Sequence, residues 1–534
     1  MNDDTPTPTH PRAKPDLRAR ARELRALGHS YNEIAAELGV SKSSCSLWLR
    51  DMPRPITGEE QTRRATAARA AGHRRRRART DDRRLATKRE AARDIGDLTD
   101  RDLLLAGAIL YWCEGAKRDG RVDFCNSDPA MIGLFLRFLD TAGVTRDRLR
   151  FQLQIHEGAD LDEAETFWRT LTGADRSRFG KPTIKKSRAD SNRRNTGPDY
   201  RGCLRVKVRH SLALRWRIEG LVHAILRIEP PSMTGLPSGI PVTGLRRRAV
   251  EMRRAGRSRA VIQERLGIDD PRLVDALLKG EPPARAWTLR ATADQINEDT
   301  ARELHARGWG YRRISDHLRV SRDVAARWVG GSGDAPTGGR AVTASRAAGI
   351  RRHWDGRRVF AEVERRLVWE EAAAWVGGLS ERDVRFLGAL AYWCEGAKDK
   401  PYRRTEQVRF INRDPALIRF FLRFVEVAGG ERHPIRFRLH IHENGDLEGA
   451  HRFWSGVIPA GHGSMFRKDR IKRHEPRTDR PEEQRDYHGC LEVVVGRSTD
   501  LYRRIEGWAL GPVLGEAAAV ARWTRGPGIP PGDS

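Results

Sequence analysis

The sequence LAGAILYWCEGAK at residues 105–117 returns as LGALAYWCEGAK at residues 387–398. Further short sequences recur in the same order: FCNSDP (124–129) and FINRDP (410–415), DYRGC (199–203) and DYHGC (486–490), RIEG (217–220) and RIEG (504–507). Upstream, RELRALGHSY (22–31) matches RELHARGWGY (302–311). The spacing predicts a tandem duplication of one α+β arrangement. Two such copies can be related by an approximate two-fold axis within one chain.

Composition narrows the class of protein. The chain has 534 residues, which predicts several domains, each with its own core. Its net charge of +28 favours nucleic acid as a partner. A GC-rich genome also raises the arginine content, but the basic residues here are clustered. The six cysteines include no C-x-x-C pair, which indicates a reducing compartment and argues against a zinc site.

The sequence shows no targeting or membrane segment. The first residues, MNDDTPTPTHPRAKP, are polar and rich in proline, unlike a signal peptide. The longest apolar run, residues 103–113, is too short to span a bilayer. We therefore expect a cytoplasmic, bacterial, nucleoid-associated protein with no membrane partner.

Residues 31–51, YNEIAAELGVSKSSCSLWLRD, predict two short helices separated by Gly39, with Ser41 capping the second. This string resembles the helix-turn-helix of resolvase-like and small regulatory DNA-binding domains. The resemblance implies that the helix after Gly39 enters the major groove. Its exposed face offers short polar donors to bases and phosphates: Lys42, Ser43, Ser44 and Ser46. An ordinary three-helix packing module is the alternative.

A second copy, YRRISDHLRVSRDVAARWVGG at residues 311–331, has Arg319 where the first copy has its turn glycine, so its turn is less defined by sequence. Arg322 is its candidate DNA contact. A weaker pattern lies at residues 249–278, with Gly267 at a helix end, and reads either as a degenerate helix-turn-helix or as a helical spacer. Residues 57–95 predict a long basic helix, which either lies along phosphates or is a solvated linker.

Each core copy contains a strand with strict period-two alternation. Leu149, Phe151, Leu153 and Ile155 alternate with polar residues, and residues 435–442 repeat the pattern. One face is then buried, and the other is basic and rich in donors. The candidate DNA contacts on these and the neighbouring strands are Arg150, Gln152, Gln154, Lys185, Lys186, Arg205, Lys207, Arg209, Arg436, Arg438, His440 and Lys472. An ordinary solvated sheet face remains the alternative.

GAILYWCEG and GALAYWCEG resemble the LAGLIDADG motif, aligned at its C-terminal end. The order of motif helix, strand, DP-capped helix and basic strands is similar to that of LAGLIDADG homing-endonuclease domains. The resemblance implies that the two motif helices pack side by side, and that antiparallel sheets form a saddle on DNA. It also implies that each terminal acid, here Glu114 or Glu395, faces a scissile phosphate and binds a divalent metal.

Helix geometry adds two expectations. Gly107 and Gly388 precede the glutamates by seven residues, two turns, so glycine and acid share a face. We expect the glycines to allow close approach of the two helices. Two carboxylates brought together in a basic cleft would suit Mg²⁺ or Mn²⁺. The repeated pairs His156-Glu157 and His442-Glu443 could supply a base or an extra ligand, or could be strand-end turn residues or DNA contacts, and we favour the second interpretation.

We therefore predict an α+β protein built as a tandem duplication of a helix-turn-helix and a LAGLIDADG-like domain with an antiparallel saddle sheet. The predicted segments are 16–55 (helix-turn-helix), 56–97 (basic helical linker), 98–230 (first LAGLIDADG-like domain), 244–285 (degenerate helix-turn-helix or spacer), 297–331 (second helix-turn-helix), 342–378 (helical linker) and 379–515 (second LAGLIDADG-like domain).

The expected function is sequence-specific binding of double-stranded DNA as a transcriptional regulator, by analogy with a bacterial sporulation-regulator family that carries a degenerate LAGLIDADG domain. A site-specific endonuclease that uses Mg²⁺ or Mn²⁺ at Glu114 and Glu395 is the alternative. An RNA-binding or nucleoid structural protein is a weaker one. A pseudo-two-fold monomer is favoured over an obligate homodimer.

Overall fold

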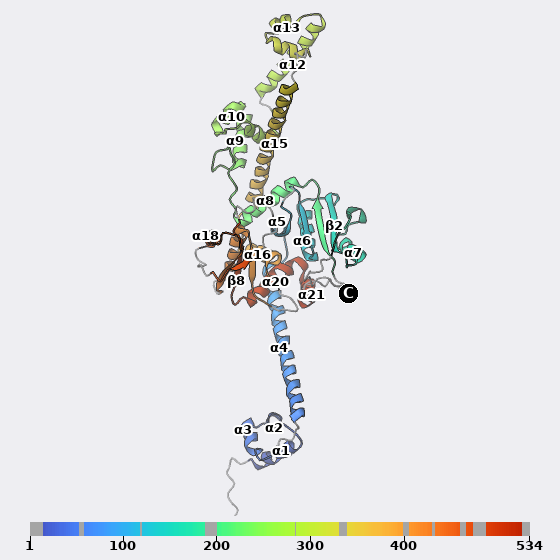
Figure 1. Cartoon of the computed structure of the whole chain (residues 1–534), viewed down its shortest axis with the longest axis vertical. Helices are drawn as coiled ribbons and strands as arrows, with labels where there is room; N and C mark the ends of the chain where they lie inside the picture. The colour runs from blue at the N-terminus through green and yellow to red at the C-terminus, as the bar shows by residue number, and fades with distance from the viewer. Residues whose placement is uncertain are drawn as a thin grey trace, which may run out of the picture. The chain divides into compact units, whose positions relative to one another are not determined.

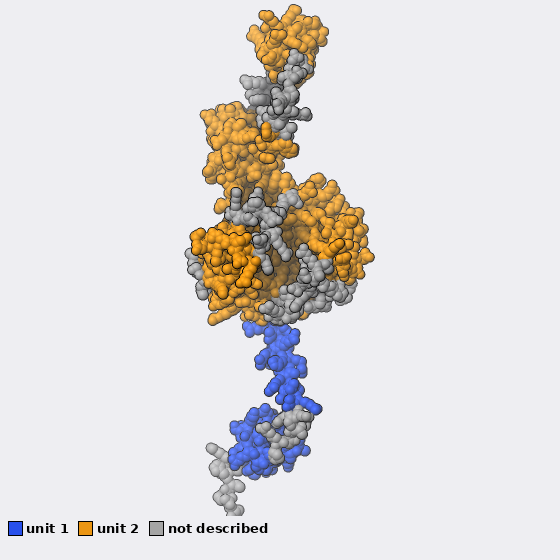
Figure 2. All heavy atoms as spheres, viewed as in Figure 1, with its two compact units in different colours: residues 1–85 blue, residues 86–534 orange. Residues whose placement is uncertain are grey.

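The computed structural model describes residues 14–52, 58–117, 120–186, 200–282, 285–330, 339–398, 405–429, 433–459, 466–473 and 487–525. It divides into two compact units, residues 1–85 and 86–534, which Figure 2 distinguishes by colour. The described residues form many helices and two small mixed sheets (Figure 1). The predicted α+β class is confirmed.

The first three-helix segment comprises α1 (Pro15–Ala26), α2 (Tyr31–Leu38) and α3 (Lys42–Trp48). Ser30 and Glu33 form a capping box at the start of α2, and Ser41 caps α3 through the amide of Ser44. Gly39 ends α2 with a φ of 63°, in the left-handed region that favours glycine. A small core forms between the helices from Ala21, Leu24, Ile34, Cys45 and Leu49.

The second three-helix segment repeats this order in α12 (Arg285–Ala306), α13 (Tyr311–Leu318) and α14 (Arg322–Trp328). Its first helix begins at Arg285, twelve residues before the predicted boundary at 297. Arg319 takes the left-handed conformation, φ 53°, at the place of Gly39. This conformation costs a non-glycine residue roughly 1–2 kcal/mol, so the turn persists here without the residue that favours it.

The segment between the two halves contains α9 (Val242–Arg254), α10 (Arg259–Leu266) and α11 (Pro271–Leu277). Its core includes Val363 and Leu367 of the long helix α15 (Gly339–Val376). Glu370 of α15 accepts hydrogen bonds from the first amides of α9, at 3.0 and 2.9 Å. The three helices therefore share one core with α15.

The first module contains α5 (Asp100–Glu114), β1 (Asp123–Asn126), α6 (Pro129–Thr141), β2 (Leu149–His156), α7 (Leu161–Thr172), β3 (Thr183–Lys185), β4 (Cys203–Val208) and α8 (Leu212–Leu226). The second module repeats it as α16 (Glu381–Glu395), β5 (Arg409–Asn412), α17 (Pro415–Val427), β6 (Ile435–His442), α18 (Leu447–Val457), β7 (Arg470–Lys472), β8 (Cys490–Val495) and α20 (Thr499–Leu514). One further helix, α21 (Glu516–Arg525), follows.

The two sheets have the same strand order, β1-β4-β2-β3 and β5-β8-β6-β7. Three strands of each are antiparallel, but the edge strand β3 or β7 pairs in parallel with β2 or β6. The expected wholly antiparallel sheet is therefore wrong at this edge. In the sequence, α7 or α18 lies between the two strands. The helix carries the chain back to the end of the sheet where the first strand began, so the second strand runs in the same direction.

In both modules a tryptophan of the helix after the long strand contacts the segment before β4 or β8. The indole of Trp168 donates to the carbonyl of Arg201 at 2.7 Å, and Trp454 donates to His488 at the same distance. The glycine that follows, Gly202 or Gly489, has a positive φ and passes so close to the central strand that a Cβ would meet a backbone oxygen at 2.6 or 2.4 Å. Each tryptophan thus joins α7 or α18 to the backbone directly before β4 or β8.

The long helix that precedes each module packs on the last helix of the other module. The final turns of α4 (Gly58–Ile95), from Ala86 onward, lie on α20, and α15 lies on α8. The contact depends on the glycine of RIEG: a Cβ at Gly507 would lie 2.3 Å from the oxygen of Lys88, and one at Gly220 would lie 2.4 Å from that of Trp369. The two modules therefore exchange their leading helices.

We predict that Gly507→Ala destabilises the protein by about 1–3 kcal/mol, because the added methyl overlaps the backbone of α4 and forces the helices apart. Chemical denaturation followed by circular dichroism measures the loss. Gly133→Ala, within α6, is the matched control, because a Cβ there meets nothing within 4 Å. Equal stability of the two variants would contradict the tight contact.

Candidate functional site

The beginnings of α5 and α16 are joined by reciprocal ion pairs. Arg101 contacts Asp383 at 3.0 Å, and Arg382 contacts Asp102 at 2.8 Å. The same arginines also donate to backbone carbonyls of the opposite half, at Val376 and Ile95. Each arginine thus contacts the aspartate of the opposite helix, and the two contacts are equivalent. Such reciprocal contacts are characteristic of two-fold symmetry.

The ends of the same helices are joined in the same reciprocal way. The indole of Trp112 donates to Asp414 at 2.8 Å, and that of Trp393 donates to Asp128 at 3.2 Å. A hydrogen bond with Cys113, together with burial, raises the pKa of the Cys394 thiol, so the two cysteines face each other. The first turns of α5 and α16 contact each other and so do the elements at their last turns, so the two helices pack in parallel.

The parallel packing brings Glu114 and Glu395 together, as the sequence predicts. Burial raises the pKa of both carboxyls, and the charge of Glu114 raises that of Glu395 further. Lys398 opposes the rise at both glutamates, and Lys117 opposes it at Glu395. The pair is thus half-buried, mutually repelling and flanked by two exposed lysines.

The predicted role of the motif glycines is wrong. A Cβ at Gly107 would lie 2.0 Å from the ring of Phe138, and one at Gly388 would lie 2.2 Å from that of Phe424. Each glycine therefore makes room for an aromatic side chain of the next helix in its own module. By helical periodicity Asp102 and Cys113, eleven residues apart, share the face that contacts the other module.

Gly115 and Gly396, directly after the glutamates, are needed for a different reason. A Cβ at either would lie 2.5 Å from the ring of Tyr111 or Tyr392. The hydroxyl of Tyr111 donates to the carbonyl of Ala116 at 2.6 Å, and Tyr392 makes the equivalent bond at 2.8 Å. The tyrosine therefore fixes the backbone that follows the acid and sets where each helix ends.

The sequence predicts Asp128 and Asp414 only as helix caps, yet both also lie near the paired glutamates. Asp128 raises the pKa of Glu114, and Asp414 raises that of Glu395. Asp128 also accepts two bonds from Arg522 of α21, one of them at 2.8 Å. Burial alone would raise the pKa of Asp128, but Arg522 brings it below its usual value. The one available signal was that tryptophan and aspartate recur together in both copies.

On the polar face of the first sheet, four of the predicted DNA contacts have hydrogen-bond partners within the protein: Arg150, Gln152, Arg205 and Lys207. Arg205 binds both carboxylate oxygens of Asp123, at 2.8 and 2.6 Å, and Lys207 donates to Gln152 at 2.8 Å. Arg150 donates to nearby backbone carbonyls. The exposed cations are at the edges of the face: Lys185, Lys186 and Arg209. Gln154 is half-buried on the central strand.

The second sheet differs because Glu492 occupies the centre of its polar face. Its carboxylate contacts His440 at 3.0 Å, Arg409 at 3.0 Å and Arg438 at 3.6 Å. The hydrogen bond from His440, with Arg409 also contributing, lowers the pKa of Glu492 to about 2. Two predicted contacts, Arg438 and His440, are thus held by an internal acid, whereas Arg436 and Lys472 are exposed.

This polar face adjoins the carboxylate pair. Burial raises the pKa of Cys490, on β8, and the charges of Glu395 and Lys472 also act on it. His156 and His442 lie at strand ends, with ring centroids 5.9 Å from Tyr200 and 6.0 Å from Tyr487. The strand-end placement that we favoured for the repeated histidines is what the structure has.

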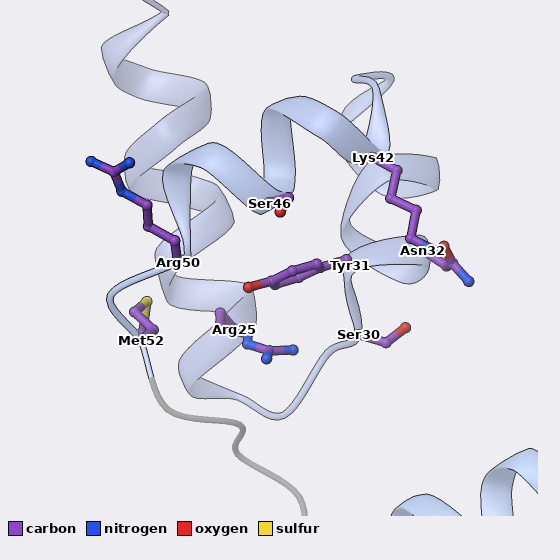
Figure 3. A pocket seen from close by; sticks show the side chains of 8 residues that line it. All are labelled: Arg25, Ser30, Tyr31, Asn32, Lys42, Ser46, Arg50 and Met52. Carbon is purple, nitrogen blue, oxygen red and sulfur yellow. The ribbon is translucent and has the colours of Figure 1, made fainter.

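In the first three-helix segment, Lys42 and Ser46 line a hollow of about 600 Å³ (Figure 3). The side chain of Ser44 instead bonds to that of Ser41, 2.9 Å away, within the cap of α3. Ser43 is exposed, and so is Arg322 at the start of α14. Two of the four predicted contacts of α3 therefore line a concave surface.

Among the described residues, no group of three or more His, Cys, Asp or Glu side chains is arranged to hold a metal ion. None of the described helices combines the length and apolar character needed to cross a bilayer. No model of a known protein family matches the chain, and neither does any curated protein or solved structure.

We predict that Glu114→Gln or Glu395→Gln raises the free energy of unfolding near pH 7. When folding raises the pKa of a carboxyl, the free energy of unfolding falls as the pH rises from the unfolded pKa to the folded pKa. Glutamine does not ionise, so the substitution removes this loss. The gain should vanish below about pH 4, where the unfolded carboxyl is also protonated. Urea denaturation at both pH values measures it. Glu381→Gln, on the exposed start of α16, is the control and should show no gain.

Proposed function

We propose that the protein binds double-stranded DNA in a sequence-specific manner and acts as a transcriptional regulator, with two LAGLIDADG-like modules forming a pseudo-two-fold core within one chain. The observation that carries the proposal is the reciprocal contact of α5 and α16, which relates two modules of equal strand order. Duplex DNA has local two-fold symmetry, so paired modules can meet paired half-sites.

Charge supports this partner. The net charge of +28 favours a polyanion, and the exposed cations of the two sheets include Lys185, Lys186, Arg436 and Lys472. The three-helix segments add a second kind of contact. Each has a short helix, α3 or α14, whose first residue is an exposed cation, Lys42 or Arg322. In a helix-turn-helix that helix supplies the contacts to base edges.

The second candidate function is site-specific DNA cleavage, and the meeting of Glu114 and Glu395 favours it. The paired carboxylates offer oxygen donors that suit Mg²⁺ or Mn²⁺, but among the described residues no third His, Cys, Asp or Glu completes a metal-binding group with them. When bound, such an ion polarises a phosphodiester and activates water. The glutamates would hold the ion, and Lys117 and Lys398 would stabilise phosphate charge. Against this candidate, Arg522 already neutralises Asp128.

The binding proposal predicts a steep dependence on salt. The logarithm of the association constant should fall linearly with the logarithm of salt concentration, with a slope of about −0.9 for each phosphate contact. Fluorescence anisotropy with a duplex selected from a random library gives the slope. A flat response would refute the proposal. Equal competition by double-stranded RNA would instead favour the RNA-binding alternative.

The cleavage candidate predicts that Glu114→Gln or Glu395→Gln abolishes cutting of the selected duplex in Mg²⁺ while the Kd changes little. Gel analysis of cut ends and anisotropy separate the two effects. Glu381→Gln, an identical change on the exposed start of α16, should leave both unchanged. A wild-type chain that binds the duplex and never cuts it rejects cleavage and leaves the regulator.

A further inference from the structure

The hollow in the first three-helix segment is lined by cations and neutral donors. Arg25, Lys42 and Arg50 supply positive charge, and Ser30, Asn32 and Ser46 supply hydroxyl or amide groups, whereas the Tyr31 hydroxyl donates to the carbonyl of Leu49 at 3.3 Å (Figure 3). No acidic side chain is among the described residues that line it. Guanidinium, ammonium and hydroxyl donors around one concavity are the groups that bind phosphate oxygens in proteins.

Arg25 is a buried cation that lines the hollow. Its side chain is 7% exposed, and its guanidinium lies 4.5 Å from the ring centroid of Tyr31. One terminal nitrogen donates to the carbonyl of His29 at 3.1 Å, but the buried Nε donates to no group in the part of the chain that the structure describes. A buried charged donor without a partner is costly. The positive charge of the Arg25 guanidinium favours an anion in the adjoining hollow.

The second three-helix segment keeps the frame of this hollow but has a different set of donors. Tyr311 matches Tyr31, and His305 takes the place of Arg25, with its ring stacked on Tyr311 and bonded to the carbonyl of Trp309. The rim residues change from Ser30, Ser46 and Arg50 to Gly310, Ala326 and Gly330. The second copy therefore lacks these two hydroxyls and the Arg50 guanidinium, but it has Arg312 in place of Asn32 and Arg322 in place of Lys42.

We infer that the hollow of the first segment is a phosphate-binding site, and that its ligand is a backbone phosphate of the DNA that the chain binds. The inference rests on the proposed function for the source of the phosphate, but the site itself is argued from unit 1 alone. The two three-helix segments are then unequal at this position, because the donors of Ser30, Ser46 and Arg50 are absent from the second.

The test uses the full chain and the variant Arg50→Ala, which removes an exposed rim cation and spares the core. The salt slope of duplex binding should fall by about 0.9, the value of one phosphate contact, and affinity should fall equally for specific and non-specific duplexes. The matched control is Arg20→Ala on α1, whose side chain pairs with Glu23 outside the hollow. An equal change in slope for both variants would mean a general effect of charge and would overturn the inference.

A second experiment distinguishes free phosphate from the DNA backbone as the ligand. Inorganic phosphate is titrated at constant ionic strength while the thermal stability of the protein is recorded. The site is supported if phosphate stabilises the wild type and the Arg20→Ala variant but not the Arg50→Ala variant. If that pattern appears while the salt slope is unchanged by Arg50→Ala, the ligand is a free phosphate and the DNA backbone is rejected. A wild type that binds no duplex removes the proposed function, and phosphate stabilisation then decides the site alone. No difference between the variants in either measurement rejects the site.

Discussion

The parallel packing of α5 on α16 is the constraint on which the rest of the core depends. Arg101 and Arg382 fix one end of the seam, and Trp112 and Trp393 fix the other. Buried, charge-assisted contacts of this kind are costly to leave half-made, so they specify one register. Once the register is set, the two acids must meet, because each ends its helix at the same position of the repeat.

The two halves are equal in architecture and unequal in chemistry. Arg522 of α21, the helix after the second module, binds Asp128. In the first module α8 is followed by the segment leading to α9, so the described residues contain no equivalent helix to bind Asp414. Glu492 draws Arg438 and His440 into an internal cluster, whereas the matching position in the first sheet is Arg205, which binds Asp123. A symmetric frame therefore presents two different polar surfaces.

Much of this arrangement could be predicted from the sequence. Period-two alternation identified β2 and β6, Ser41 and Asp128 marked helix starts, and repetition of the motif placed Glu114 beside Glu395. Contacts between segments could not be predicted, because no local pattern records them. Nothing near Gly107 shows that Phe138 will fill its space, and nothing near Lys207 shows that it will pair with Gln152. The parallel edge strand was missed for the same reason.

The exchange of leading helices has a consequence for how such a chain could arise. A polypeptide with one copy alone would leave the seam of α5 and the glycine surface of α8 open to water, since both are covered by the other copy. It would therefore need a second identical polypeptide, and the product would be a homodimer with swapped arms. Fusion into a single gene would free each half to mutate separately, which identical subunits cannot do. The asymmetry at Arg522 and Glu492 is what that freedom permits.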